Sequence, residues 1–212
     1  MSGAPHGALI DALCEFLEAA VHTVLRARGP YPPELFERAR LYGVAVARAR
    51  HPEVCSYIAS VIDNVKPLLA SESLQELAVA FFGPDGEPLS KVSFLLQGLA
   101  PTLIDLDPEA LEGALRSALL RLQFIDNLAA PLPAGATFEL LALATSRAGA
   151  DPAFWAEEAA TEAAALSPPV AAVPVQAVAL EGVLSMQILL EEGAGTVNGG
   201  VRAAAAGGGA AR

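Results

Sequence analysis

The chain has 212 residues, which is enough for one sizeable domain, and its 53% hydrophobic content against 17% charged residues excludes wholesale disorder. Its formal net charge of −11 has the opposite sign from that of most surfaces that bind duplex DNA, because phosphate neutralisation supplies much of that affinity. Direct nucleic-acid binding is therefore disfavoured, unless a local basic patch supplies it. The densest candidate patch consists of Arg26, Arg28, Arg38, Arg40, Arg48 and Arg50.

Cysteine usage and hydropathy place further limits. Cys14 and Cys55 each lie in a helical pattern among apolar residues, which predicts small buried thiols in a reducing compartment and no disulfide framework. The N-terminus lacks a basic region followed by an apolar one, so no secretory signal is expected. The uncharged stretch 163–180 has the length of a membrane span, but its prolines indicate an extended segment, and no membrane partner is expected.

Two helices and one short strand are predicted in the first third of the chain. Apolar residues at spacings of three and four predict a helix over about 7–27, which the proline-rich stretch 30–33 terminates. An arginine-rich stretch follows, with a short strand predicted near 42–47. The second helix is predicted to begin with Pro52 in its first turn and to end at Lys66-Pro67.

The clearest hairpin follows the second helix. Residues 76–82 form a largely apolar run, residues 83–86 (Gly-Pro-Asp-Gly) have strong turn chemistry, and residues 90–96 alternate apolar and polar side chains. Because the first strand is apolar on both faces, helices are expected to cover at least one side of the sheet.

The third helix has the strongest start signal in the chain. Asp107 is a predicted N-cap, Pro108 lies in the first turn, and Glu109 lies near the positive end of the helix dipole. A strand is predicted at 137–144, after a Pro-Leu-Pro-Ala-Gly turn.

The C-terminal part has a different composition. Residues 145–174 are rich in alanine, glycine and proline and contain the single tryptophan, Trp155, and residues 183–191 again predict a strand. Helices and antiparallel strands that do not alternate regularly predict an α+β domain.

No pattern in the sequence indicates catalysis. His6, His22 and His51 lack the neighbours and spacing of metal ligands, and no glycine-rich phosphate loop or nucleophile elbow is present. Adjacent carboxylates such as Glu157-Glu158 and Glu191-Glu192 are more typical of a solvated surface than of acid–base catalysis. We therefore predict a protein that is not an enzyme and that holds no metal or cofactor.

Several segments carry a resemblance to a known family. They are Asp11-Ala-Leu-Cys-Glu-Phe-Leu-Glu-Ala-Ala-Val-His22, Tyr31-Pro32, His51-Pro52-Glu53, Tyr57-Ile58, Val65-Lys-Pro-Leu-Leu69, Pro168-Pro169-Val170, Val173-Pro174-Val175 and Leu184-Ser-Met-Gln-Ile-Leu-Leu-Glu-Glu192. On these residues the chain resembles the HORMA-domain accessory subunits of DNA polymerase zeta, the mitotic arrest deficient 2-like proteins. The resemblance covers most of 8–192, whereas 146–167 aligns poorly.

The resemblance implies an α+β HORMA domain, in which three helices pack on a mainly antiparallel sheet and a C-terminal safety belt closes over a partner peptide. The implied organisation is a flexible N-terminus at 1–6, a HORMA domain at 7–192 with its core at 7–145 and its belt at about 146–192, and a disordered Gly/Ala tail at 193–212. A proline- and alanine-rich segment before a late apolar strand independently suits a closure that rearranges.

The same resemblance assigns candidate binding residues. Tyr57 and Trp155 match an aromatic pair that holds a proline-containing peptide of the polymerase catalytic subunit, although Tyr57 is equally compatible with a core position. Val173, Gln187 and Leu189 match a surface for the C-terminal domain of a Y-family polymerase, and Leu189 stands where an aromatic is expected. Arg116 matches a self-association residue, and is equally compatible with an ordinary solvated arginine.

The leading hypothesis is a nuclear, non-catalytic adaptor in lesion bypass and DNA repair, with the cytoplasm as an alternative location. The implied partners are the catalytic subunit of polymerase zeta, a Y-family polymerase, a second copy or another HORMA protein, and a shieldin-like partner. The alternatives are a checkpoint or meiotic HORMA adaptor that binds a different closure peptide, and a small-molecule enzyme without a recognisable motif.

Overall fold

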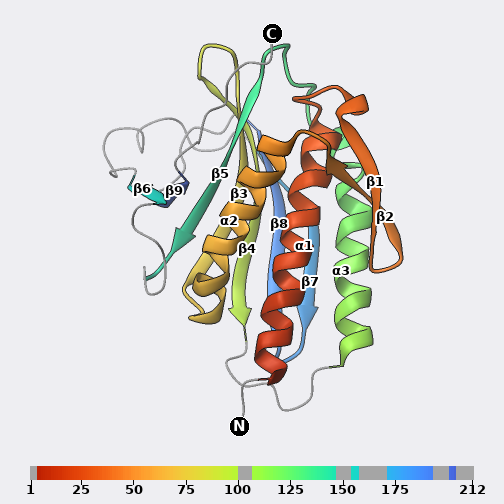
Figure 1. Cartoon of the computed structure of the whole chain (residues 1–212), viewed down its shortest axis with the longest axis vertical. Helices are drawn as coiled ribbons and strands as arrows, with labels where there is room; N and C mark the ends of the chain where they lie inside the picture. The colour runs from red at the N-terminus through yellow and green to blue at the C-terminus, as the bar shows by residue number, and fades with distance from the viewer. Residues whose placement is uncertain (1–3, 100–106, 147–153, 158–170, 193–200, 204–212) are drawn as a thin grey trace.

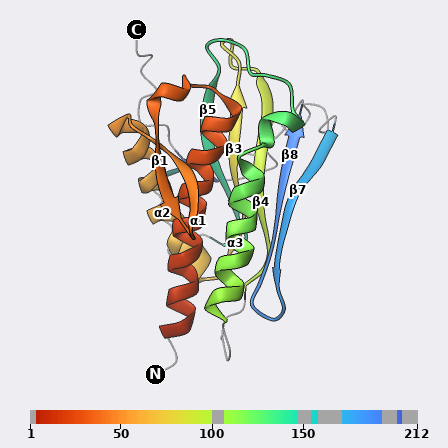
Figure 2. The same cartoon turned by 90° about the vertical axis from the view of Figure 1, so that its right-hand side faces the viewer.

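The computed structural model describes residues 4–99, 107–146, 154–157, 171–192 and 201–203. Within these ranges, three α-helices lie against one face of a seven-stranded sheet, and a separate two-stranded hairpin lies beside them (Figures 1 and 2). The helices are α1 (Ala4–Arg28), α2 (Pro52–Ala70) and α3 (Pro108–Leu122), with short 3-10 turns η1 (Pro33–Leu35) and η2 (Ile125–Leu128). No described helix is both long and apolar enough to cross a membrane.

Helix α1 packs its apolar face into the centre of the core. Leu9, Leu13 and Phe16 are fully buried, and the Phe16 ring meets the Phe94 ring edge-on at 6.3 Å. The helix ends at Gly29, whose positive φ of 72° lets its N–H bond to the Leu25 carbonyl. The helix begins at Ala4, inside the N-terminal segment that was predicted to be flexible.

The two-stranded sheet consists of β1 (Phe36–Leu41) and β2 (Val44–Ala49). Both turn residues, Tyr42 and Gly43, have positive φ (49° and 75°), the geometry of a tight hairpin turn. The strand predicted at 42–47 was therefore wrong in position, because it ran through this turn. The Tyr42 hydroxyl donates a hydrogen bond to the Ala12 carbonyl of α1 (2.9 Å), which holds a non-glycine residue in this conformation.

Helix α2 also differs from its predicted end. Pro67 lies inside the helix, which continues to Ala70. Leu68 and Leu69 in the last turn are buried, so their burial favours one more turn after the proline.

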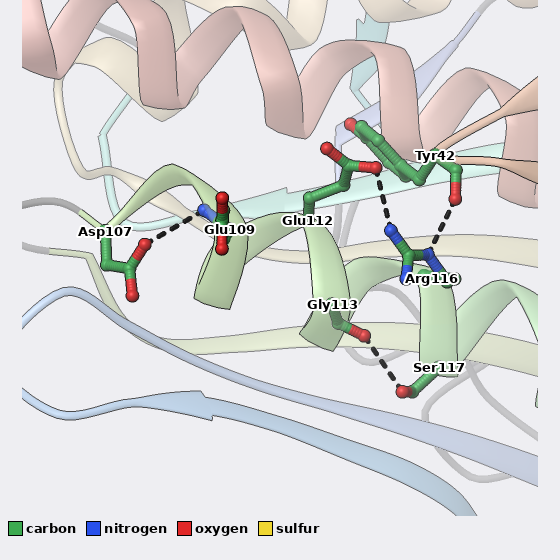
Figure 3. Close-up of polar contacts among 7 residues, drawn as sticks. All are labelled: Tyr42, Asp107, Glu109, Glu112, Gly113, Arg116 and Ser117. Carbon is green, nitrogen blue, oxygen red and sulfur yellow. Dashed lines mark hydrogen bonds and ion pairs between the residues drawn. The ribbon is translucent and has the colours of Figure 1, made fainter.

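The predicted start of α3 is confirmed. The Asp107 carboxylate accepts a hydrogen bond from the Glu109 N–H at 3.0 Å, as Figure 3 shows, and Pro108 occupies the first turn. Leu111, Leu115, Ala118, Leu119 and Leu122 form its buried face.

The strand order of the large sheet is β6-β9-β5-β3-β4-β8-β7, and every described pair is antiparallel. The predicted hairpin is confirmed, and the strands predicted at 137–144 and 183–191 are present. The strands are β3 (Leu74–Phe82), β4 (Pro88–Leu99), β5 (Thr137–Ala144), β6 (Trp155–Glu157), β7 (Ala171–Leu180), β8 (Leu184–Glu192) and β9 (Val201–Ala203).

Two C-terminal strands were not predicted as such. Strand β7 lies in the segment predicted to be merely extended, and β9 lies in the tail predicted to be disordered, so that prediction was wrong for residues 201–203. Most of the alanine-, glycine- and proline-rich segment 145–174 that was expected to suit a closure, including 147–153 and 158–170, lies outside the described residues.

Candidate functional site

The outer edge of β5 is the first part of the candidate site. Just after β5, the Thr145 N–H donates a hydrogen bond toward β3, to the carbonyl of Ser73, the residue before that strand. The Leu140 N–H instead donates to the Tyr57 hydroxyl, on the side away from β3. Because backbone groups alternate direction along a strand, odd-numbered residues of β5 pair with β3. The even-numbered residues Phe138, Leu140 and Ala142 therefore direct their N–H and C=O groups to the outer edge.

Tyr57 lies at this edge. It projects from α2, and its hydroxyl accepts the Leu140 N–H at 3.1 Å. Its ring meets the Phe138 ring edge-on at 5.9 Å, and Tyr31 meets the same ring at 6.1 Å. All three rings are partly buried. They form an aromatic cluster (Tyr31, Tyr57 and Phe138) beside the outward-facing backbone of β5, a surface on which a proline ring packs well.

Trp155 lies two strands beyond β5. Strand β9 pairs with β5 (Leu141 with Arg202, Ala142 with Val201) and β6 pairs with β9 (Trp155 with Ala203). Figure 1 shows the short strands β6 and β9 beside β5. Continuing the first register places Ala203 opposite Leu140, so Leu140, Ala203 and Trp155 form one row across the sheet.

Tyr57 and Trp155 thus lie at the same level of the sheet, on either side of one strand position. Leu140 faces the helices, and residues directly opposite each other share a face, so Trp155 also faces the helix-bearing side. Trp155 is buried (4% exposed), packs edge-on against Phe154 at 5.2 Å, and its indole N–H has no hydrogen-bond partner among the described residues. Both residues of the predicted aromatic pair therefore lie on the helix-bearing side of the sheet, at the same level along β5.

The second predicted surface lies on the hairpin of β7 and β8. Gln187 and Leu189 alternate along β8 and share its helix-free face, and Gln187 is exposed. Val173 pairs with Leu190, whose buried side chain faces the helices. Val173 therefore lies on the opposite face from Gln187 and Leu189, and the structure does not bring these three residues together.

Arg116 lies on α3, away from both of these places. Its Nε donates to the Tyr42 carbonyl at 2.7 Å, and its guanidinium pairs with Glu112 one helical turn earlier at 2.9 Å (Figure 3). The bond to Tyr42 joins α3 to the β1–β2 turn. The Arg116 side chain is still 44% exposed and therefore partly accessible.

A charged cluster on the helix-free face joins β8 to the core of the sheet. The Lys91 ammonium of β4 lies 3.0 Å from Glu76 of β3 and 3.3 Å from Glu191 of β8. The Ser93 hydroxyl donates to the same Glu76 oxygen at 2.6 Å. Lys91 and Ser93 are buried, so this cluster is a desolvated connection between three strands.

Two buried titratable groups outside the candidate site, His22 and Cys14, have pKa values shifted by burial. The His22 Nδ1 accepts the Ala49 N–H at 3.3 Å, and burial, with a smaller contribution from Arg48, lowers the pKa of His22 to about 4. Burial raises the pKa of the Cys14 thiol to about 11. No group of three or more His, Cys, Asp or Glu side chains suited to a metal ion occurs in the part of the chain that the structure describes.

The sequence did not point to Phe138 or to the edge position of Leu140. The sequence shows that Phe138, Leu140 and Ala142 alternate along the predicted strand. This alternation does not indicate which strands lie next to β5, so it could not identify an outer edge. Tyr31 was noted within a matching segment, without a role at this site.

Comparison with known proteins adds independent information on sequence. No family model matches the chain. Over 135 residues it is 33% identical to the human mitotic spindle assembly checkpoint protein MAD2B, a match that covers 62% of this chain and 63% of that protein. Over 131 residues it is 36% identical to the DNA polymerase zeta processivity subunit of Arabidopsis thaliana, covering 61% of this chain and 60% of that protein. The match thus spans less than two thirds of these curated relatives.

Solved structures agree on the fold. A chain in the crystal structure of the mitotic checkpoint complex superposes with a TM-score of 0.71 at 19% identity, over 86% of this chain and 97% of that one. The Caenorhabditis elegans protein HTP-2, bound to the HIM-3 closure motif, superposes with a TM-score of 0.64 at 15% identity, over 84% and 87%. The chain therefore has the HORMA fold, and its homologues include proteins named MAD2B and DNA polymerase zeta processivity subunit.

Proposed function

We propose that this chain is a non-catalytic adaptor that captures a proline-containing peptide of the polymerase zeta catalytic subunit as an added strand at the outer edge of β5. The observation that carries the proposal is the placement of Tyr57 and Trp155 at one level of the sheet, with one strand position between them. The choice of polymerase zeta as the partner rests on relatives named DNA polymerase zeta processivity subunit.

Strand addition explains what each part of the site contributes. Outward N–H and C=O groups of β5 supply sequence-independent hydrogen bonds, and the aromatic cluster with Trp155 supplies side-chain selectivity. A segment that closes over the added strand slows its release, so we expect a low dissociation rate more than a high association rate.

Titration of a fluorescent proline-containing polymerase peptide tests this function. The double variant Tyr57→Ala/Trp155→Ala is expected to bind at least about tenfold more weakly, since buried aromatic contacts dominate such interfaces. Because Trp155 is buried, Trp155→Phe is measured as well, together with thermal unfolding of each variant. Phe124→Ala, at a ring that is 64% exposed between α3 and η2, is the matched control. Unchanged affinity in a folded double variant contradicts the proposed site.

A checkpoint or meiotic adaptor is the second candidate. The observation that favours it is the likeness to HTP-2, whose structure contains a closure motif. Closure peptides from such partners, titrated beside the polymerase peptide, separate the two functions, because the polymerase adaptor binds its own peptide more tightly.

Bridging to a Y-family polymerase is the second part of the proposal. Support comes from Gln187 and Leu189, which share the helix-free face of β8. Gln187→Ala and Leu189→Ala are expected to weaken binding of the C-terminal domain of that polymerase. Leu189→Tyr restores an aromatic ring and is expected to strengthen it. Val173→Ala lies on the other face and is expected to have a smaller effect, whereas equal effects at all three positions contradict a one-face surface.

A further inference from the structure

We propose that the outer edge of β1 is a second strand-addition site, which takes an extended acidic peptide with Asp or Glu at every second position. This edge belongs to the β1–β2 hairpin, which lies at the right-hand border of the molecule in Figure 1. It is separate from the edge of β5, so the proposal goes beyond the function proposed above. Arg38 and Arg40, two of the basic residues that the sequence gathers in this region, carry it.

The hydrogen bonds of the hairpin define which backbone groups face outward. The Arg50 N–H donates to the Leu35 carbonyl at 2.8 Å, so these two residues form a hydrogen-bonded pair at the open end of the hairpin. Such pairs recur at every second residue of an antiparallel ladder. Ala39 therefore bonds to β2, whereas Arg38 and Arg40 on either side of it direct their N–H and C=O groups away from β2.

The outer edge of β2 is bonded to side chains from the rest of the domain. The Ala45 carbonyl accepts a hydrogen bond from the Gln123 amide at 2.7 Å. The Ala49 N–H donates to His22 Nδ1 at 3.3 Å, and the Ala49 carbonyl accepts from the Cys55 thiol at 3.0 Å. The two arginine positions of β1 have no such contact within the described residues. The hairpin thus has one bonded edge and one edge open to a further strand.

Both arginine side chains are exposed on one face of the hairpin. Arg38 and Arg40 are two residues apart along the strand, so they share a face and lie roughly 7 Å apart. Their cross-strand neighbours, Ala47 and Ala45, are too small to cover the guanidinium groups. Neither arginine forms an ion pair with a described residue, although acidic residues outnumber basic ones by 24 to 13 in the chain. The edge therefore presents two cations that the described chain does not neutralise.

A strand added at this edge meets the backbone groups and the cations together. Its residues opposite Arg38 and Arg40 project on the same face as the two arginines. Carboxylates at these two positions neutralise the guanidinium groups, which can hold a carboxylate by two parallel N–H bonds. The residue between them projects to the other face, where Ala39 packs against the core, so a β-branched side chain suits it. The preferred pattern is therefore acidic, β-branched, acidic.

The arginines also determine what the edge rejects. Charged side chains on an exposed edge discourage pairing with apolar strands, so the same residues favour an acidic partner over an apolar one. A nucleic-acid backbone fits less well. Arg48 pairs with Glu37 and lies on the opposite face from Arg38 and Arg40, and the net charge of −11 opposes phosphate binding.

Binding of two fluorescein-labelled peptides to the full chain tests the proposal. The probe is Thr-Asp-Thr-Glu-Thr, and Thr-Thr-Asp-Glu-Thr has the same composition and charge without the alternation. The probe is expected to bind about two- to fivefold more tightly, because only the probe places both carboxylates opposite the arginines. Hydrogen exchange is expected to show protection of the Arg38 and Arg40 amides when the probe binds. The Ala47 amide, which faces the other edge of the hairpin, is expected to be unchanged.

Variants separate charge from backbone pairing. Arg38→Ser/Arg40→Ser is expected to bind the probe about tenfold more weakly. Lys66→Ser/Arg202→Ser loses the same charge on α2 and β9, which lie to the left of α1 in Figure 1, and is expected to stay within about twofold of the unmodified chain. Arg40→Pro also removes an outward N–H, so it is expected to bind about threefold more weakly than Arg40→Ser. Thermal unfolding of each variant measures whether it is folded.

Four outcomes overturn the proposal. Equal binding of the two peptides, or failure of both to bind the folded chain, excludes selection of alternating carboxylates. Probe binding without protection at Arg38 and Arg40 excludes strand addition. Arginine-dependent binding of an oligothymidylate but of neither peptide assigns the edge to nucleic acid. Protection that rises with protein concentration in the absence of peptide assigns it to a second copy. Capture of the polymerase peptide at β5 is measured separately, so its failure affects none of these outcomes.

Discussion

The ammonium group of Lys91 lies 3.3 Å from a carboxylate oxygen of Glu191, and this ion pair joins β4 to β8 on the side of the sheet that the helices do not cover. Glu76 of β3 lies on the other side of the same ammonium group at 3.0 Å. One buried cation thus connects the β7–β8 hairpin to the central strands.

Replacing this cation is expected to be strongly destabilising. Lys91→Ala leaves two largely buried carboxylates without their counter-charge, and we expect a loss of about 3 kcal/mol in the free energy of unfolding. Urea denaturation measures it. The matched variant Glu76→Gln/Lys91→Met/Glu191→Gln removes all three charges and is expected to be closer to the unmodified chain. A Lys91→Ala variant within about 0.5 kcal/mol of that chain contradicts this account.

Tyr57→Phe separates the hydroxyl of Tyr57 from its ring. The ring contact with Phe138 is kept, but the Leu140 N–H loses its acceptor, so we expect a loss of about 1 kcal/mol in stability and faster exchange of the Leu140 amide. Tyr31→Phe removes a hydroxyl from the other ring that contacts Phe138 and is the control. Exchange at Leu140 that is no faster in Tyr57→Phe than in Tyr31→Phe would rule out this hydrogen bond.

His22 makes stability depend on pH in a defined direction. Its folded-state pKa of about 4 lies below the ordinary value of 6.5, so the unfolded chain binds more protons between these values. Stability from this group is therefore complete above pH 6.5 and falls as the pH decreases toward 4, by at most about 1.4 kcal/mol per pH unit. Denaturation across this range is compared with His22→Asn, which is expected to show a shallower pH dependence; parallel curves would refute the prediction.

Cys14 is expected to resist alkylation in the folded protein. Raising its pKa from 9.0 to about 11 lowers the thiolate fraction near pH 8 by roughly a hundredfold, and its burial limits access further. Iodoacetamide labelling followed by mass spectrometry measures the rate, with the urea-unfolded chain as the reference. Labelling of Cys14 at equal rates in the folded and unfolded chains would contradict its burial.

Arg116→Ala tests the predicted self-association residue. Because the side chain is partly exposed, its loss is expected to change folding stability by less than about 1 kcal/mol. If α3 mediates self-association, sedimentation measures a weaker dimer for this variant than for Arg121→Ala on the same helix. Identical sedimentation of the two variants would refute a role of Arg116 in self-association. Its contacts with Tyr42 and Glu112 would then be its only supported role.

The parts of the fold that local patterns define could be predicted from the sequence. The cap at Asp107 and the apolar alternation of β4 are signals within a few residues, and both were correct. Strand β1 was missed because its three charged residues, Glu37, Arg38 and Arg40, interrupt the apolar pattern, since the hairpin is largely exposed.

The site depends on relationships that local patterns do not contain. Tyr57 and Trp155 could be named by resemblance, but their common level follows from pairing between β5, β9 and β6, which are far apart in the chain. The position of Val173 follows from a register shift between Pro174 and Gln176, which changes the face that each side chain occupies. Neither feature has a sequence signal of its own.

Pro174 in β7 makes the two borders of the large sheet unequal. Strand β7 forms one border, as Figure 2 shows, and a proline there has no N–H to offer to a further strand. Growth of the sheet by backbone pairing is thereby discouraged on that side, whereas the opposite border is formed by the three-residue strand β6, which contains no proline. The two borders of the described sheet are consequently not equivalent, so copies of the molecule lack a matching pair of open edges for joining end to end into fibres.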